Sequence, residues 1–467
     1  MQTMSTADAA FLYAETPTAP MHVGTAGIFD GPPPAFDEVI AMLERKLPLL
    51  PRYRQRVRFV PNDLGRPVWV DYPHFDLGFH LRRTAVPSPG GDKELKELGA
   101  RVLAQALDRE KPLWELWMIE GLADGRWALL SKSHHCMVDG VSGTSLLSTL
   151  FDDNLSAEPE PWAPGREPTD EELVTQALAT RQVSFAEQIA AWGEMMEAAN
   201  AHTAMTRSAQ FLEGQDRLRQ ATGTPARSAL LGPVSPHRRW TWVRYRLADV
   251  KAIRAGLGGT VNDVVLAVIA GAFRTLLQAR GESTQGRTLK TMVPVSVRRD
   301  TESGQMSKRI AAVYPELPID TPDLAAVLGK VREQMDGIKQ SHQAVAADVL
   351  TSMAGFQPPE LIAQASRLAA QMTDTATESV YETVATNVPG PQKPMFALGR
   401  ELLEMLPWIP LQSPVRINVP ISSYNGGLVF GIVGDYDSSP DIEVLADGIH
   451  AGLEQLKAAA ASPAERR

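Results

Sequence analysis

The chain has little cysteine and no excess of basic charge, and these two facts restrict the structural class and the partners that we expect. Its single cysteine, Cys136, excludes an internal disulfide framework and fits a reducing compartment. The 46 basic and 55 acidic residues give a net charge of −9, which argues against a nucleic-acid partner. The 467 residues, 44% of them hydrophobic, are enough for two or three domains with substantial cores.

Long hydrophobic runs are also missing. A membrane-spanning helix needs roughly 20 apolar residues, and the closest run, 264–273, ends at Arg274. The amino terminus has no basic segment followed by an apolar one, so we expect no signal peptide. The sequence therefore predicts a protein that is soluble or only peripherally bound to a membrane.

Two common catalytic devices are absent as well. There is no glycine-rich phosphate loop of the Walker type, which disfavours nucleotide hydrolysis. The only adjacent histidines, His134 and His135, cannot easily chelate one ion, and no third His or Cys lies at ligand spacing. We therefore expect no metal site.

What the chain does have is the sequence His134-His135-Cys136-Met137-Val138-Asp139-Gly140. Residues 126–133 before it read as a strand, and residues 143–151 after it read as a helix with Ser142 as N-cap. An Asp-Gly turn between a strand and a helix suits an ordered loop. Histidine can take and return a proton near neutral pH, because its ordinary pKa is about 6.5. The pattern indicates a site with a histidine base.

Other segments occur with this motif in a fixed order along the chain. They are Asp8–Leu12, Pro20–Gly24, Pro112–Trp117, Gly259–Ala267, Pro294–Arg298 and Asn387–Pro391. Together with the histidine motif they resemble the bacterial wax ester synthase/acyl-CoA:diacylglycerol acyltransferases, over about residues 5 to 456. That family belongs with the chloramphenicol acetyltransferase-like enzymes and the condensation domains of peptide synthetases.

The resemblance implies an α/β fold of two chloramphenicol acetyltransferase-like domains, joined by a helical linker, with the active-site channel at their interface. The acidic, proline-rich stretch 158–168 reads as a linker, residues 170–218 as one or two long helices, and residues 240–247 as a strand. We therefore predict an N-terminal domain over 1–157, a linker with connecting helices over 158–238 and a C-terminal domain over 239–467.

The resemblance also implies a reaction. His135 would act as general base while a long-chain acyl group passes from acyl-CoA to diacylglycerol or a long-chain alcohol, giving triacylglycerol or wax ester for lipid storage without a cofactor. Two alternatives stay open. One is a condensation-like transferase with a different amine or hydroxyl acceptor, and the other is a catalytically silent lipid- or CoA-binding protein.

The remaining residues of the motif have supporting roles in this interpretation. His134 shapes the loop, and Asp139, beside Gly140, either orients His135 or, as we favour, braces the loop through an arginine. Candidate arginines are Arg298 and the cluster Arg52, Arg54 and Arg56. A thiol nucleophile at Cys136 is disfavoured, because neighbouring side chains seldom point together and free cysteine is commonly inert and buried.

The resemblance further implies that six residues outside the motif line the substrate channel: Pro112, Leu113, Trp114, Glu115, Asn262 and Asp263. For Trp114 and Glu115 we expect packing beside the site and no part in the chemistry. Asn262 and Asp263 also open a helix predicted over 261–280, with Thr260 as N-cap, so simple capping is an alternative role. The apolar stretch 395–411 is either a buried interdomain loop, which we favour, or a patch that contacts lipid. We expect a cytoplasmic protein, with peripheral contact to the inner membrane face or lipid droplets as a possibility.

Overall fold

The structure is a computed structural model that describes residues 1–137, 149–151, 158, 161–180, 226–299, 307–340 and 358–461. Asp139, Gly140, the predicted cap at Ser142 and most of the predicted helices over 143–151 and 170–218 lie outside these residues. So does the side chain of Arg298. Within the predicted helical linker, residues 170–180 are helical.

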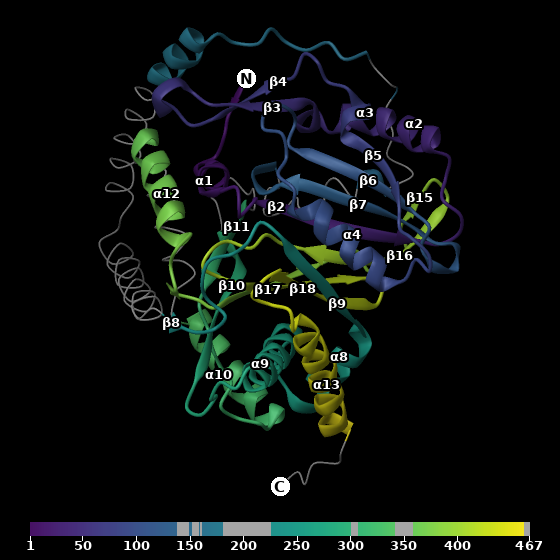
Figure 1. Cartoon of the computed structure of the whole chain (residues 1–467), viewed down its shortest axis with the longest axis vertical. Coiled ribbons are helices and arrows are strands. Elements are labelled where there is room, and N and C mark those ends of the chain that lie inside the picture. Colours follow the sequence, from purple (N-terminus) through teal and green to yellow (C-terminus); the bar gives the residue numbers. More distant parts are fainter. Residues whose placement is uncertain are drawn as a thin grey trace.

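Two mixed β-sheets organise the chain (Figure 1). The first has the strand order β15-β16-β2-β7-β6-β5. Its strands, in chain order, are β2 (His22–Phe29), β5 (Leu81–Ala85), β6 (Trp114–Glu120), β7 (Trp127–His134), β15 (Phe396–Ala397) and β16 (Arg400–Trp408). All pairs are antiparallel except β5 with β6. Strand β7 lies between β2 and β6, and all eight of its residues are buried.

The second sheet has the order β11-β10-β14-β17-β18-β9, with β12 paired to β10. Its strands are β9 (Arg238–Arg246), β10 (Thr288–Arg299), β11 (Ser307–Val313), β12 (Glu316–Pro318), β14 (Thr383–Pro389), β17 (Ile417–Tyr424) and β18 (Gly427–Asp435). The strand predicted over 240–247 is thus β9, which begins two residues earlier.

The chain crosses back between the sheets. Strand β16 comes from the second half of the sequence but pairs with β2 of the first sheet, from Leu402 opposite Phe29 to Trp408 opposite Gly24. A division between residues 238 and 239 falls after the first residue of β9, and it does not separate the two sheets. The stretch 395–411 is not a loop as a whole, because Arg400–Trp408 form β16. It is not an exposed patch either, because Leu402, Leu406 and Trp408 are buried while Phe396 and Leu403 are exposed.

Smaller strands complete the sheet structure. A three-stranded sheet contains β1 (Gln2–Thr3), β4 (Val68–Asp71) and β3 (Gln55–Arg58) in that order, and β13 (Glu378–Ser379) pairs with β8 (Ala226–Arg227).

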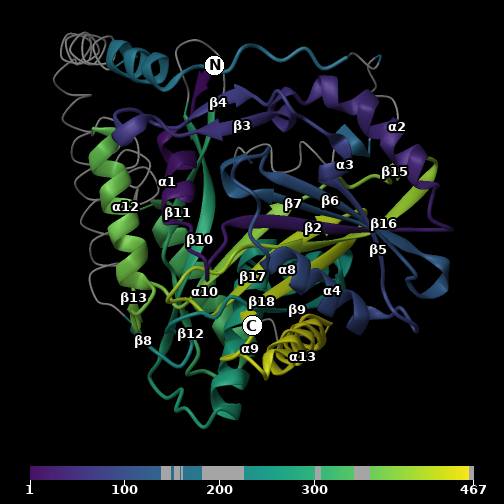
Figure 2. The same ribbon diagram turned by 45° about the horizontal axis from the view of Figure 1, so that its top comes forward.

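Helices cover both sheets (Figures 1 and 2). Around the first half lie α1 (Thr6–Ala14), α2 (Phe36–Lys46), α3 (Leu77–His80), α4 (Asp92–Ala104) and, from the second half of the chain, α12 (Pro359–Thr373). Against the second sheet lie α8 (Leu247–Leu257), α9 (Val261–Ala279), α10 (Leu324–Gln340) and α13 (Ile442–Ala461). Short 3-10 turns occur at Leu47–Leu49, Pro51–Arg54, Pro61–Asp63, Ala123–Gly125 and His135–Met137.

Helix α9 is the centre of the second half. It packs on α13, α10 and α8, and its buried face includes Phe273 and Leu276, both 0% exposed. The predicted N-cap is confirmed, because the Thr260 hydroxyl accepts the backbone N–H of Asp263 at 3.2 Å. By length and composition alone, α9 is the one described helix that could cross a membrane, but two thirds of that apolar stretch is buried inside the protein.

The two halves meet in an aromatic cluster. Trp240 and Trp242 of β9 pack with Trp408 of β16 and with α4, in one continuous hydrophobic core that also includes residues of β2 and β7. Gly99 of α4 lies so close to Trp240 that a Cβ at this position would be 2.4 Å from the indole ring. This core fixes β7, and the histidines at its end, relative to the second sheet.

Candidate active site

The histidine pair begins where β7 ends. His134 is the last residue of β7, and His135 begins the 3-10 turn His135–Met137. The backbone N–H of His134 donates to the Leu113 carbonyl at 2.9 Å, and that of His135 donates to the Met21 carbonyl at 2.8 Å. The two histidines are thus held by the backbones of segments on either side.

The His135 ring stacks on Phe11 of α1, with ring centroids 3.8 Å apart and an interplanar angle of 21°. The residue is partly exposed, and its buried Nδ1 has no hydrogen-bond partner among the described residues. Burial, with a smaller contribution from His134, lowers the pKa of His135 to about 4. The imidazole is therefore neutral at physiological pH and can accept a proton.

His134 is 1% exposed and its ring is differently engaged. Its Nδ1 accepts the backbone N–H of Cys136 at 3.1 Å. Because Nδ1 accepts this hydrogen bond, we assign the ring proton of His134 to Nε2, which faces Glu15 Oε2 at 3.6 Å. A nitrogen that already carries a proton cannot act as a base, so this geometry favours a supporting role for His134.

Cys136 is buried among Leu12, Leu113 and other apolar residues. Burial raises the pKa of its thiol well above the ordinary value, and nearby Asp8 and Glu15 add to the shift. A nucleophilic cysteine needs a lowered pKa. The surroundings of Cys136 therefore oppose that role.

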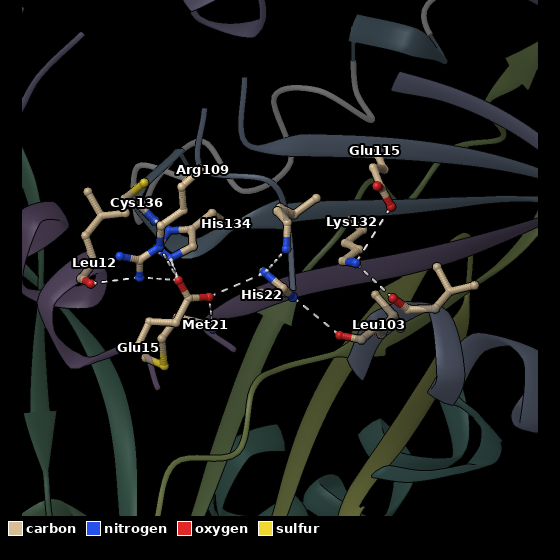
Figure 3. A network of polar contacts seen from close by, with 12 residues as sticks. Leu12, Glu15, Met21, His22, Leu103, Arg109, Glu115, Lys132, His134 and Cys136 are labelled. Atoms are coloured by element: carbon tan, nitrogen blue, oxygen red, sulfur yellow. Dashed lines mark hydrogen bonds and ion pairs between the residues drawn. The ribbon is translucent and has the colours of Figure 1, made fainter. Parts of the chain in front are cut away.

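Around His134 lies a network of polar contacts, most of them between buried groups (Figure 3). Glu15, the C-cap of α1, accepts the backbone N–H of Met21 at 3.1 Å and the Arg109 Nε–H at 2.8 Å. Burial alone would raise the pKa of Glu15, but contacts with His134 and Arg109 outweigh it and lower the pKa to about 2. Glu15 is thus a carboxylate at all ordinary pH values.

The network continues along the same face of the sheet. His22, opposite His134 in the register of β2 and β7, places Nε2 3.6 Å from Glu15 Oε1. Burial, with the charge of nearby Lys132, lowers the pKa of His22 to about 3. Lys132, 1% exposed, donates to the Val102 carbonyl at 2.9 Å and lies 3.7 Å from Glu115. Burial lowers the pKa of Lys132.

The predicted channel segment lies directly beside the histidines. Pro112, Leu113 and Trp114 are buried, and the Leu113 carbonyl is the acceptor for His134 noted above. The Trp114 indole N–H donates to the Tyr53 carbonyl at 2.8 Å and its ring stacks on His80 at 4.7 Å. Glu115 faces Lys132 and accepts the Trp117 indole N–H at 3.0 Å. In the structure these residues support β7.

Asn262 and Asp263 lie at the start of α9 in the other half of the molecule. The Asp263 carboxylate accepts the backbone N–H of Thr260 at 2.7 Å and so completes a capping box. Within the described residues, no hydrogen bond or ion pair joins either residue to His134 or His135. Their predicted contribution to the channel stays a prediction.

Three of the arginines proposed to brace Asp139 have partners among the described residues, which do not include Asp139 itself. Arg56 pairs with Glu110 at 2.8 Å and with Glu167. Arg52 and Arg54 lie over the rings of Trp69 and Trp162, each 4.3 Å from the ring centroid. Among the described residues, no group of three or more His, Cys, Asp or Glu could hold a metal ion.

No role was predicted for five residues of the site: Phe11 and His22, which lie in the family-like segments Asp8–Leu12 and Pro20–Gly24, and Glu15, Arg109 and Lys132. One signal was available for Lys132, because it lies in the predicted strand 126–133, and a lysine in a buried strand must find partners. The partners themselves come from distant segments and carry no such signal.

Comparisons with known proteins agree with this arrangement. A model of the wax ester synthase/diacylglycerol acyltransferase catalytic domain matches residues 4–265, and a model of the family's C-terminal domain matches residues 307–457. A probable diacylglycerol O-acyltransferase of Mycobacterium tuberculosis is 36% identical over 461 residues, which cover 98% of this chain and 96% of the relative. Another putative one from the same species is 31% identical, over 98% of this chain and 90% of the relative.

Solved structures show the same fold. A wax ester synthase/diacylglycerol acyltransferase from Marinobacter aquaeolei VT8 matches with a TM-score of 0.67 and 25% identity, over 98% of this chain and 100% of the other. The first condensation domain of the calcium-dependent antibiotic synthetase matches with a TM-score of 0.60 and 16% identity, over 99% and 97%. The predicted two-domain α/β fold is confirmed. The chain belongs to the wax ester synthase/diacylglycerol acyltransferase family.

Proposed function

We propose that this enzyme moves a long-chain acyl group from acyl-CoA to diacylglycerol or a long-chain alcohol, with His135 as general base. The observation that carries the proposal is the position of His135 directly after β7, where it is partly exposed and its ring stacks on Phe11 of α1. Its lowered pKa leaves the imidazole free to accept a proton. The names of the relatives support the substrate classes, since those of Mycobacterium tuberculosis are called diacylglycerol O-acyltransferases and the Marinobacter protein also a wax ester synthase.

In the proposed reaction, His135 accepts the proton of the acceptor hydroxyl while that oxygen attacks the thioester carbonyl. The carbon–sulfur bond then breaks, and the CoA thiolate takes the proton back from His135. The products are an ester and free CoA, and the histidine ends as it began. No cofactor is needed for this balance.

The loss of rate expected without His135 follows from the proposed chemistry. A positioned general base contributes roughly 10²- to 10⁴-fold to the rate. The rest comes from the orientation of two substrates and the stabilisation of the oxyanion. The Nε2–H tautomer of His134 supports a division of labour in which one histidine moves the proton and the other holds the loop.

We also propose that the enzyme is cytoplasmic and meets its apolar acceptor at a lipid surface, either the inner membrane face or a lipid droplet. Three large apolar side chains, Leu361, Leu368 and Met372, are 53 to 66% exposed along α12, which supports such a contact. Flotation of the purified protein with phospholipid vesicles would test it, and a protein that stays entirely at the bottom of the gradient would contradict it.

The main experiment compares the wild type with His135→Ala and His134→Asn. Each protein is incubated with a long-chain acyl-CoA and, in turn, diacylglycerol, a fatty alcohol and a long-chain amine. Released thiol and neutral-lipid product are measured together by mass spectrometry. We expect ester from the wild type, a loss of roughly 10²- to 10⁴-fold in His135→Ala, and a smaller loss in His134→Asn.

The other outcomes are informative. Thiol release without ester would mean hydrolysis, and amide formation would favour the condensation-like alternative. If His135→Ala binds acyl-CoA but makes no ester, the histidine serves chemistry and not binding. If wild type and His135→Ala make ester equally well, the proposed role of His135 is wrong.

A further inference from the structure

We propose that Glu15 is a positioning residue that sets the geometry of His135 by anchoring the backbone of His135 and the ring of His134. This inference rests on the proposed function, because it assigns a purpose to Glu15 only if His135 is the base. Glu15 does not touch the His135 ring and is not itself a catalytic residue.

The two oxygens of Glu15 reach the two histidines by different routes. Oε1 accepts the backbone N–H of Met21 at 3.1 Å, and the carbonyl of the same Met21 accepts the backbone N–H of His135 at 2.8 Å. Oε2 faces Nε2 of His134 at 3.6 Å. That distance exceeds a hydrogen bond, so the contact is an attraction between a carboxylate and a polar N–H.

The Glu15 carboxylate is well anchored. Its side chain is 10% exposed, and a buried carboxylate is stable only with charged or hydrogen-bonding partners. Arg109 supplies the charge through two contacts, and it also donates to the Leu12 carbonyl at 3.0 Å. Arg109 thus fixes both the carboxylate and the end of α1.

Helix α1 also supplies the group that contacts the His135 ring. Phe11, four residues before Glu15, stacks on that imidazole. Helix α1 therefore contacts the His135 ring directly, through Phe11. Glu15, at the end of the helix, reaches the His135 backbone indirectly, through Met21. A small shift of a reacting group can cost about 10²-fold in rate, so the position of α1 matters for the proton transfer.

The competing explanation is that Glu15 only stabilises the fold. Glu382 provides a matched control, because it is 2% exposed, accepts from one arginine, Arg287, at 3.0 Å, and accepts one backbone N–H, from Lys290, at 3.1 Å. Among its described hydrogen bonds and ion pairs, none involves a histidine.

The experiment compares Glu15→Gln with Glu382→Gln in the full-length protein, using kcat, KM for acyl-CoA and the melting temperature. Glutamine keeps the shape of the side chain, but only its one carbonyl oxygen can accept a hydrogen bond. It can therefore replace only one of the two oxygens of Glu15 as an acceptor. For Glu15→Gln we expect kcat to fall by about 10- to 100-fold while KM stays within about twofold. For Glu382→Gln we expect a similar loss of melting temperature and an unchanged kcat. Equal kcat values for the two variants would overturn the proposal.

A second readout does not depend on turnover. The histidine ring signals of the protein are recorded by NMR and assigned with His134→Asn and His135→Ala. We expect Glu15→Gln to shift the His134 and His135 signals and Glu382→Gln to leave them in place. If Glu15→Gln does not fold, Glu15→Asp, which keeps the charge but withdraws it by one methylene, takes its place with the same expectation for kcat.

The two proposals can fail separately. If the wild type makes no ester or amide with any acceptor, the proposed function fails, and the NMR comparison still decides whether Glu15 orients the histidines. If the wild type is active but both histidine signals and kcat are unchanged in Glu15→Gln, only the positioning role fails.

Discussion

Strand β7 lies in the first half of the molecule and helix α9 in the second. Both are buried, but their buried side chains differ in chemistry. In α9 the buried residues are apolar except Asp263, which the cap of the same helix satisfies. In β7 four consecutive buried residues are polar or charged, from Ser131 to His134. A buried polar group without partners costs roughly 1–3 kcal/mol.

The difference matters for the proposed chemistry, because the buried polar side chains of β7 need partners from other parts of the chain. Lys132 and His134 contact Val102 of α4, Glu115 of β6 and Glu15 at the end of α1, so these three elements are linked to β7 through polar contacts. Around α9, packing alone is enough. We therefore expect substitutions near α9 to change stability without changing turnover, and substitutions near β7 to change turnover and the response to pH.

The largest effect on stability is expected for Phe273→Ala in α9. Phe273 is 0% exposed, and truncating a buried phenylalanine costs about 3–5 kcal/mol of unfolding free energy. Denaturant unfolding would measure the loss, and kcat per folded molecule should not change. Thr275→Ala, at an exposed position of the same helix, is the control, with an expected change below about 0.5 kcal/mol. A large drop in kcat at unchanged stability would remove the contrast between the halves.

Low pH should test the other side of the comparison, the buried ionisable groups around β7. The pKa values of His135 and His22 are lowered to about 4 and about 3, so both are neutral in the folded protein at pH 5 but take up a proton near pH 6.5 once unfolded. Glu15, with its pKa lowered to about 2, adds a loss of stability below about pH 4.5. Stability should therefore fall as the pH drops below about 6.5.

The same shift predicts the pH profile of activity. His135 can act as the proposed base only when neutral, so kcat/KM should stay level down to about pH 5 and fall about tenfold per pH unit below the pKa of His135, about 4. His135→Gln should reduce the pH dependence of unfolding between pH 4 and 6.5 by up to one proton. An acid limb at pH 6.5 in the wild type would contradict the lowered pKa.

Local patterns in the sequence predicted much of this fold. Helix α9 was predicted over 261–280 and is found over Val261–Ala279, because its cap and apolar periodicity are properties of neighbouring residues. The return of β16 to the first sheet was not predicted. Pairing between Leu402 and Phe29 joins residues far apart in the chain, and a local pattern carries no record of its partner strand.

The site divides in the same way. His134 and His135 could be found from the sequence because the whole motif is contiguous. Glu15 could not, since a glutamate in a polar stretch reads as a solvated charge. Its burial depends on Arg109, Met21 and His134, which three different segments bring together.

The contact between the halves should respond to Gly99→Ala. A Cβ at Gly99 would come within 2.4 Å of Trp240, so the indole ring or α4 must move, at a cost of about 1–3 kcal/mol. Gly329→Ala in α10 is the matched control, because nothing lies within 4 Å of the added carbon there, and alanine in an exposed helix should stabilise by about 0.5–1 kcal/mol. Thermal unfolding measures both. A neutral Gly99→Ala would mean that the halves tolerate relative movement.

The smallest effect concerns Thr260, and it tests which side of the comparison Asn262 and Asp263 belong to. Thr260→Ala removes the side-chain acceptor for the Asp263 N–H, and losing such a cap costs about 1 kcal/mol. Thr260→Ser keeps the acceptor and is the control. If the pair only caps α9, kcat/KM for acyl-CoA should stay unchanged while the unfolding free energy falls. If kcat/KM drops while stability is unchanged, the start of α9 shapes the substrate channel as well, and the second half contributes more than packing to the reaction.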